Sequence, residues 1–302
     1  MMEPLWGIDL GGTKIEGVVL DSLEKEPILR TRIDTEAHKG YAHILDQIEK
    51  LCAILTDKTG CRPGKIGLGT PGTEDPKLGR MKNCNTTALN GMPLRKDLLA
   101  RLKMDVRMAN DANCFALAEA LMGAGKGAET VFGVIMGTGV GGGVVIKGRI
   151  LNGLQGIAGE WGHNELIPGG TDCYCGRKGC VETVISGKGL ENYYESHAGT
   201  RLYLKEIVKQ ARLGTNPHAA ATLKRLITYF GKAIANVINI LDPHAIVLGG
   251  GVTNIEELYT DGVAEIRKHI FNNRVDTPIL RHKLGDSAGV FGAAMLALDS
   301  PV

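Results

Sequence analysis

Three cysteines lie within eight residues of the sequence, in the segment Cys173-Tyr174-Cys175-Gly176-Arg177-Lys178-Gly179-Cys180, and His163 precedes the first of them by ten residues. Three thiolates and one imidazole form the closed ligand set of structural zinc. Disulfides within this segment are disfavoured, because sulfurs at positions i and i+2 pair poorly. We therefore predict a structural Zn²⁺ site whose ligands are His163, Cys173, Cys175 and Cys180. The alternative is that these are ordinary buried cysteines.

Two glutamates flank the cysteine-rich segment: Glu160 in Gly-Glu-Trp-Gly-His and Glu182 in Cys-Val-Glu. A metal ion here would hold both carboxylates on a rigid loop, which suits a site for a polar ligand better than a purely structural metal. Trp161 lies between Glu160 and Gly162, and we expect it to pack in the core rather than against a ligand.

Two glycine-rich turns, each between two short apolar runs, lie about 130 residues apart in the chain. The first is Asp9-Leu10-Gly11-Gly12-Thr13-Lys14, and the second spans Gly137–Gly143. Their backbone amides, with a hydroxyl and a lysine in the first turn, predict a clamp for phosphate groups. A third cluster, Gly249-Gly250-Gly251, is placed to admit an adenine. The alternative for the two turns is that they are plain β-turns.

The segment Gly137–Gly142 formally matches the dinucleotide fingerprint G-x-G-x-x-G. That fingerprint requires a helix after the glycines, because the helix N-terminus carries the pyrophosphate. Here Val144, Val145 and Ile146 follow, and they favour a strand. The sequence therefore predicts a hairpin and argues against a Rossmann domain.

The composition is that of an ordinary globular protein, with 43% hydrophobic and 23% charged residues among 302 and a net charge of +2. This balance gives no electrostatic reason to expect nucleic acid or membrane as a partner. The first residues lack a basic region and an apolar core, so we expect no signal peptide. The other four cysteines are scattered, which favours a reducing, cytoplasmic location.

The pattern of apolar residues alternates between strands and helices, which predicts an α/β fold. Strands are expected at 5–10, 15–20, 65–69, 106–109, 131–136, 144–146 and 245–248. Helices are expected at 41–55, 94–102, 111–121, 187–196, 202–213, 218–241, 256–271 and 287–298.

Taken in order, six motifs resemble those of the ROK family of bacterial sugar kinases and regulators, from residue 5 to residue 298. Besides the first two glycine motifs, they are Asn110-Asp111-Ala112-Asn113, Gly159-Glu160-x-Gly162-His163, the cysteine-rich segment with Glu182, and Gly249-Gly250-Gly251. The resemblance implies two actin-like ATPase domains of the ribonuclease H type, which flank a cleft for nucleotide and sugar. It also implies ATP-dependent phosphorylation of a hexose, usually at the 6-hydroxyl.

The resemblance assigns roles to individual residues. Asp111 would be the general base, which suits the chemistry because an alcohol at neutral pH is a poor nucleophile. Mg²⁺ would be carried on ATP, near Asp9. The sugar would be bound by Asn110, Glu160, His163 and Glu182, and more weakly by Gly72 and Asn85. His163 would use one ring nitrogen for zinc and the other for the sugar. The nucleotide would be bound by Asp9, Gly11, Gly12, Thr13, Lys14, Gly137, Thr138, Gly139, Gly249, Gly250 and Gly251.

The segment Asn83–Arg95 bears on the choice of sugar. Glucose-preferring members of the family often have an Asn-Trp pair in this loop, which is absent here. The loop looks more like that of N-acetylglucosamine kinases, because the lack of a Trp leaves room for a 2-acetamido group. Glucose stays the main alternative, with mannose and fructose behind it.

The expected domains are 1–115 completed by 287–302, and 116–286 with the zinc loop and a helical insertion. Relatives suggest a homodimer or homotetramer. Two other functions stay open. A sugar-sensing regulator would need a DNA-binding module before the first glycine motif, which begins near residue 7. A non-catalytic sugar-binding module would predict the loss of Asp111, Thr13 or Lys14, all of which are present.

Overall fold

A computed structural model describes residues 3–24 and 26–298. The chain divides into two compact units. The first comprises the chain up to Gly127, the segment Gly143–Ala158 and the chain from Lys283 onward; the second comprises Ala128–Gly142 and Gly159–His282.

The first unit is built on a five-stranded sheet of order β3-β2-β1-β4-β7. Its strands are β1 (Leu5–Leu10), β2 (Lys14–Leu20), β3 (Leu29–Asp34), β4 (Lys65–Thr70) and β7 (Asp105–Asn110). The β1–β2 pair is antiparallel and forms the predicted hairpin, whereas β1, β4 and β7 are mutually parallel. The carboxyl ends of these three strands therefore lie at one edge of the sheet.

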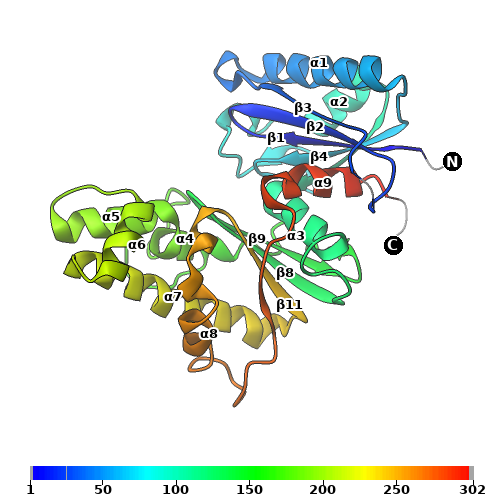
Figure 1. Cartoon of the computed structure of the whole chain (residues 1–302). Helices are drawn as coiled ribbons and strands as arrows, with labels where there is room; N and C mark the ends of the chain where they lie inside the picture. The colour runs from blue at the N-terminus through cyan, green and yellow to red at the C-terminus, as the bar shows by residue number, and fades with distance from the viewer. Residues whose placement is uncertain (1–2, 25, 299–302) are drawn as a thin grey trace. The chain divides into compact units, whose positions relative to one another are not determined.

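Helices cover both faces of this sheet (Figure 1). Helix α1 (Tyr41–Thr59) buries Ile44, Ile48, Leu51 and Leu55 at helical spacing, as predicted. Helix α9 (Ala288–Met295) packs on the opposite face, against β1 and β4. It comes so close that a side chain at Gly7 would overlap the backbone of Val290 and Ala294. The first unit is completed by α2 (Leu94–Leu102), α3 (Asp111–Leu121) and the short strands β5 (Thr73–Glu74), β6 (Met81–Lys82) and β10 (Arg149–Ile150).

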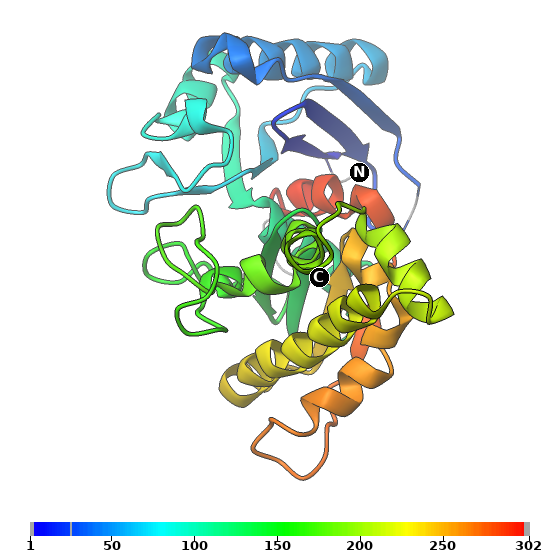
Figure 2. The same cartoon turned by 90° about the vertical axis from the view of Figure 1, so that its left-hand side faces the viewer.

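A second five-stranded sheet has the order β10-β9-β8-β11-β12. Its remaining strands are β8 (Thr130–Met136), β9 (Val140–Ile146), β11 (Ala245–Gly249) and β12 (Ile279–Arg281). The helices of the second unit are α4 (Val181–Ile185), α5 (Gly187–Ala198), α6 (Leu204–Leu213), α7 (Pro217–Leu241) and α8 (Asp261–Ile266). The long helix α7 packs against α6 and α8 (Figure 2).

The prediction of one helix at 256–271 is wrong. The structure has a 3₁₀ turn at Glu256–Leu258 and then the short α8. The Tyr259 hydroxyl, next to this turn, donates a hydrogen bond to the carbonyl of Thr253 at 3.0 Å. Strand β3 was not predicted. It is an edge strand whose inward residues are only half-buried, and charged residues alternate with them, so no apolar run marks it.

The two units differ from the domains expected from the sequence, because residues 116–127 and 143–158 join the first unit. For residues 116–127 the reason is the extensive packing of α3 against α9. Helix α3 therefore belongs with the sheet that α9 covers.

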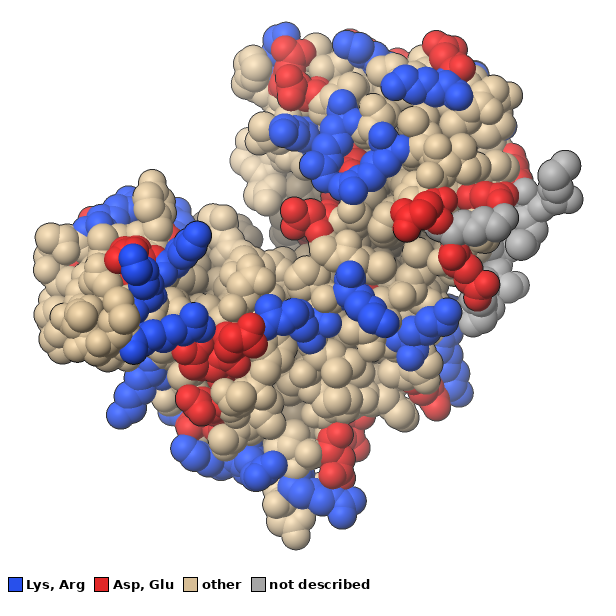
Figure 3. Space-filling view, viewed as in Figure 1, with Lys and Arg blue, Asp and Glu red and all other residues tan. Residues whose placement is uncertain are grey.

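Basic and acidic side chains are interspersed over the face shown in Figure 3. Among the described residues, no helix is both long and apolar enough to span a bilayer.

Glu119 on α3 fixes the chain at the points where it leaves and re-enters the first unit. Its fully buried carboxylate accepts hydrogen bonds from the backbone amides of Ala124, Lys283 and Leu284, at 2.8–3.1 Å. Ala124 lies just before the exit at Gly127, and Lys283 is the point of return. No sequence motif signalled this residue, because its partners are backbone amides from distant segments.

We expect Glu119→Ala to lower the free energy of unfolding by about 3 kcal/mol, because several charge-assisted hydrogen bonds are lost together. Urea denaturation followed by circular dichroism measures the change. Glu195→Ala, at an exposed position of α5, is the control and should cost less than about 0.5 kcal/mol. Equal stability of the two variants would show that the carboxylate does not hold these segments.

Candidate functional site

The predicted first phosphate turn joins β1 to β2 and is braced from behind. The Gly11 amide donates to the carbonyl of Lys14 at 3.0 Å, which closes the turn. Fully buried Thr35 then donates from its hydroxyl to the Gly11 carbonyl at 2.7 Å and from its amide to the Thr13 carbonyl at 2.8 Å. The side chains of Thr13 and Lys14 are exposed, as ligands for a phosphate must be. Sequence reasoning missed Thr35, which has no motif of its own.

Asp9, the half-buried residue before the last residue of β1, lies in a crowded position. A side-chain carbon at Gly289 would lie 2.9 Å from Asp9 Oδ2, and one at Gly69 would lie 3.3 Å from Oδ1. Burial, and then the negative charges of Asp111 and Glu16, raise the pKa of Asp9 to about 7, against a smaller opposing effect of Arg32. A cation placed beside Asp9 would therefore stabilise the ionised form of this carboxyl group, which fits the predicted proximity of Mg²⁺.

Asn110 and Asp111 occupy the junction between β7 and α3. Asn110 is the N-cap, and its Oδ1 accepts hydrogen bonds from the amides of Ala112 at 2.9 Å and Asn113 at 3.2 Å. Its Nδ2 donates to Asp111 Oδ1 at 2.8 Å, and the Ala112 amide donates to the same oxygen at 2.7 Å. One residue thus caps the helix and orients the neighbouring carboxylate.

The pKa of Asp111 is raised, because desolvation by the surrounding protein outweighs the hydrogen bonds from Ala112 and Asn110 that favour the ionised form. The residue nevertheless keeps an exposed surface. An accessible carboxylate with a raised pKa is a better proton acceptor than an ordinary surface aspartate.

Gly72 and Asn85 lie beyond the carboxyl end of β4, next to β7. Thr70 and Asn110 are register partners at the ends of the two strands. The Asn85 amide donates to the Pro71 carbonyl at 3.3 Å. Gly72 packs so tightly on Cys84 that a side-chain carbon there would lie 2.6 Å from its sulfur. The structure therefore brings both residues of the predicted sugar loop to the strand ends that carry Asp9 and Asn110.

The four predicted zinc ligands converge in the second unit. One ligand atom from each of His163, Cys173, Cys175 and Cys180 lies within 4.8 Å of all the others. Cys175 Sγ is 3.7 Å from Cys180 Sγ, and Cys173 Sγ is 3.6 Å from His163 Nδ1. Tetrahedral zinc with ordinary bond lengths requires about 3.8 Å between two sulfurs and about 3.5 Å between sulfur and nitrogen. The geometry therefore fits Zn²⁺ held through Nδ1 of His163.

The electrostatics of the cluster also favour a metal. Burial disfavours the Cys175 thiolate, but hydrogen bonds from the backbone and side chain of Arg177 and from the other two cysteines outweigh it and lower the pKa of Cys175 to about 6. The thiolate is the form that binds metal. No sequence motif signalled this contribution of Arg177.

The zinc loop and its flanks hold the second glycine-rich turn. Glu182 Oε2 accepts a hydrogen bond from the amide of Val140 at 3.0 Å, and Trp161 Nε1 donates to the Gly141 carbonyl at 3.0 Å. The Gly187 amide donates to the Gly137 carbonyl at 2.8 Å. Trp161 is 5% exposed and packs edge-on against Phe132, so its assignment to the core is confirmed. Glu182, which follows the last zinc ligand in the sequence, thus contacts the predicted phosphate turn in the structure.

The third glycine cluster follows β11. Gly249 is the last residue of that strand, and Gly250 has φ +87°. A side-chain carbon at Gly250 would lie within 3.0 Å of the backbone nitrogen of Met136 at the end of β8. Glycine is therefore required here by backbone conformation and close approach. Its predicted contact with adenine stays a prediction.

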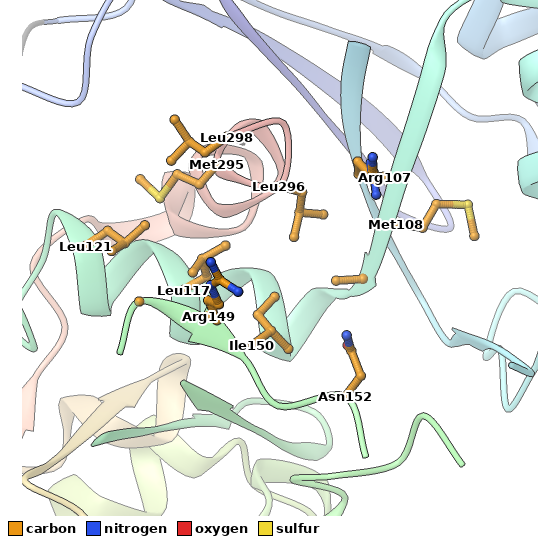
Figure 4. A pocket seen from close by; sticks show the side chains of 12 residues that line it. Arg107, Met108, Leu117, Leu121, Arg149, Ile150, Asn152, Met295, Leu296 and Leu298 are labelled. Atoms are coloured by element: carbon orange, nitrogen blue, oxygen red, sulfur yellow. The ribbon is translucent and has the colours of Figure 1, made fainter. Parts of the chain in front are cut away.

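A cavity of about 360 Å³ lies in the first unit, between α3, α9, β7 and β10 (Figure 4). Leu117 and Leu121 of α3 face it from one side and Met295 and Leu298 from another. Its lining includes none of the residues predicted to bind sugar, nucleotide or zinc.

Comparisons with known proteins cover nearly the whole chain. The ROK family model matches residues 5–300. An N-acetyl-D-glucosamine kinase of Vibrio atlanticus is 39% identical over 302 residues, which cover 96% of this chain and 98% of that protein.

Two solved structures share the fold. A ROK hexokinase from Thermus thermophilus matches with a TM-score of 0.88 and 32% identity, covering 98% of each chain. A ROK family glucokinase from Streptomyces griseus, solved with glucose and AMPPNP, matches with a TM-score of 0.79 and 29% identity, covering 98% of this chain and 99% of that one.

We expect the purified protein to contain one zinc per chain, and Cys175→Ala to lose it, because three ligands hold zinc far less tightly than four. Elemental analysis of gel-filtered protein measures the metal. Cys61→Ala, outside the cluster, is the control and should retain the metal. Wild-type protein prepared without chelators and found to contain no zinc would contradict the assignment.

A second expectation concerns Asp9, whose pKa rises from 3.8 to about 7 on folding. Between these pH values the folded protein keeps a proton that the unfolded chain has lost, so stability falls as the pH rises towards 7 and stays lower above it. Asp9→Asn cannot ionise. Its melting temperature should therefore exceed that of the wild type at pH 8, with the difference shrinking towards pH 4.

Thermal denaturation between pH 4 and pH 8 measures this difference. Asp57→Asn, at an exposed position of α1, serves as the control for a lost surface charge. A constant difference between wild type and Asp9→Asn across this range would show that Asp9 does not titrate as described.

Proposed function

This chain belongs to the ROK family, and from that premise we propose that it transfers the γ-phosphoryl group of ATP to the 6-hydroxyl of N-acetylglucosamine. The family contains regulators as well as kinases, but full-length relatives at 36–39% identity are kinases, so the chain is an ATP-dependent sugar kinase, and it has the actin-like ATPase fold. The observation that carries the proposed mechanism is the Asn110–Asp111 pair, which presents an oriented carboxylate with a raised pKa at the carboxyl end of a parallel sheet.

Asp111 acts as the general base. Its Oδ1 already accepts two hydrogen bonds, so we assign Oδ2 to receive the proton of the sugar hydroxyl. The oxygen that loses this proton bonds to the γ-phosphorus as the bond from that phosphorus to the bridging oxygen of ATP breaks. The products are the sugar phosphate and ADP.

Backbone and side-chain donors of the two glycine-rich turns support nucleotide binding. Gly12, Thr13 and Lys14 supply the first set, and Thr138 and Gly139 supply the second. The amides of Gly11 and Gly137 close the two turns instead, on the carbonyls of Lys14 and Gly139. Magnesium, when bound with ATP, neutralises charge on the phosphates. Asp9 is the carboxylate best suited to lie near it, because its own ionisation is held back by burial and by Asp111.

The sugar is bound by Asn110, Glu160, His163 and Glu182, with Gly72 and Asn85 from the loop after β4. Carboxylates, amides and imidazoles suit a polyol, because each buried hydroxyl left unpaired costs about 1–3 kcal/mol. Zinc in this proposal is structural and holds His163 and the flanking glutamates in place.

Two observations favour N-acetylglucosamine over glucose. Cys84 and Asn90 exchange two hydrogen bonds, at 2.9 and 3.0 Å, so the loop after β6 is closed on itself. This loop carries no tryptophan where a 2-acetamido group has to fit. In addition, relatives at 36–39% identity over their full length are N-acetyl-D-glucosamine kinases. The homodimer or homotetramer remains part of the proposal.

The proposal is tested by ADP release with Mg-ATP and each of five sugars: N-acetylglucosamine, glucose, N-acetylmannosamine, mannose and fructose. We expect the highest kcat/KM with N-acetylglucosamine. We further expect Asp111→Asn to lower kcat by about 10²–10⁴-fold while sugar binding, measured by calorimetry, persists. Asp57→Asn is the matched control. A preference for glucose would overturn the choice of sugar, and an active Asp111→Asn would remove Asp111 as the base.

A further inference from the structure

Both ring nitrogens of His163 have partners in this structure. Nδ1 faces the zinc ligands, 3.6 Å from Cys173 Sγ. Nε2 lies 3.1 Å from the hydroxyl of Tyr174, and the two rings meet edge-on with centroids 5.2 Å apart. The nitrogen assigned to the sugar in the proposed function is thus occupied by a side chain of the protein itself.

The metal cluster fixes which partner donates this hydrogen bond. Zinc requires the lone pair of Nδ1, so the neutral imidazole carries its proton on Nε2. His163 is then the donor and the Tyr174 oxygen the acceptor. Histidines that bind metals almost always donate their second N–H to an acceptor, which fixes the ring and strengthens the metal bond. Tyr174 meets this requirement within the zinc loop.

Tyr174 combines a fixed backbone with a movable ring. It lies between two zinc ligands, and its neighbours are held by the hydrogen bonds from the Cys173 amide to the Arg177 carbonyl at 2.8 Å and from the Gly176 amide to the Cys173 carbonyl at 3.0 Å. Its side chain, however, is 76% exposed. The ring can therefore leave His163 without opening a cavity in the core, unlike the buried Trp161.

We propose that Tyr174 is a positioning residue that accepts the Nε2 proton of His163 in the sugar-free enzyme and gives up this place to a hydroxyl of the bound sugar. Only the second part of this proposal, the replacement of Tyr174 by a sugar hydroxyl, rests on the proposed function. With this exchange, the Nε2 proton of His163 has a hydrogen-bond acceptor both with and without bound sugar. The imidazole therefore stays oriented towards zinc in both cases. A sugar without a hydroxyl at that place could not replace Tyr174.

The test measures the rate at which zinc passes from the protein to the coloured chelator 4-(2-pyridylazo)resorcinol. Wild type, Tyr174→Phe and Tyr203→Phe are compared without sugar and with saturating N-acetylglucosamine or glucose. Tyr203 is a matched control, because it is 77% exposed and lies at the start of α6 rather than in the zinc loop. Tyr174→Phe keeps the ring and removes the acceptor oxygen alone.

Without sugar, we expect Tyr174→Phe to release zinc about 10-fold faster than wild type, in line with the loss of other partners of metal-bound histidines. With saturating sugar, the two rates should converge, because the sugar hydroxyl takes the same proton in both proteins. A role in loop stability alone would leave the difference unchanged by sugar.

Equal release rates of wild type and Tyr174→Phe without sugar would overturn the assignment of Tyr174 as the partner of His163. A difference that persists at saturating sugar would overturn the exchange. Calorimetry on the wild type separates these results from a failure of the proposed function. If no sugar of the panel binds, the proposed function and the exchange both fail, while the sugar-free comparison still decides the role of Tyr174.

Discussion

The crowding of two carboxylates at the edge where three parallel strands end is the constraint on which the first unit depends. Burial disfavours the ionised form of both Asp9, near the end of β1, and Asp111, after β7, and the charge of Asp111 raises the pKa of Asp9 further. Glycines at positions 69 and 289 leave room for Asp9, and α9 presses on the sheet behind it. The fold thus tolerates an unfavourable pair of acidic groups at this edge of the sheet.

In the second unit, the zinc loop is the segment that holds other residues in place. Four ligand atoms bring distant segments together, and the same segments reach the glycine-rich turn through Glu182 and Trp161. A loop with little regular structure would not hold such side chains in place by itself, because it has too few buried apolar contacts. A metal ion bound by these four residues would supply the missing rigidity and would order the zinc loop and the glycine-rich turn together.

Features of the fold and of the candidate site that depend on short stretches of sequence could be predicted from the sequence. Amphipathic spacing located α1, the Asn-Asp cap located the start of α3, and the cysteine spacing located four residues that could hold a metal ion. The prediction of one helix at 256–271 failed, because a 3₁₀ turn at Glu256–Leu258 precedes α8 and leaves only six residues in that helix. Prediction also failed where distant contacts decided the outcome. Thr35 and Glu119 carry no motif, since their partners are backbone groups brought near by folding.

The sequence alone determined the chemistry that the chain can offer: which carboxylates, thiolates and glycines it has, and in what order they follow strands and helices. Those properties are local, because residue type and spacing set them before any packing occurs. Only the tertiary structure decided which groups share an environment. The raised pKa of Asp9, the bracing of the second turn by Glu182 and the contact of Tyr174 with His163 all depend on distances between elements. Such distances follow from burial and packing across the chain, which no short stretch of sequence contains.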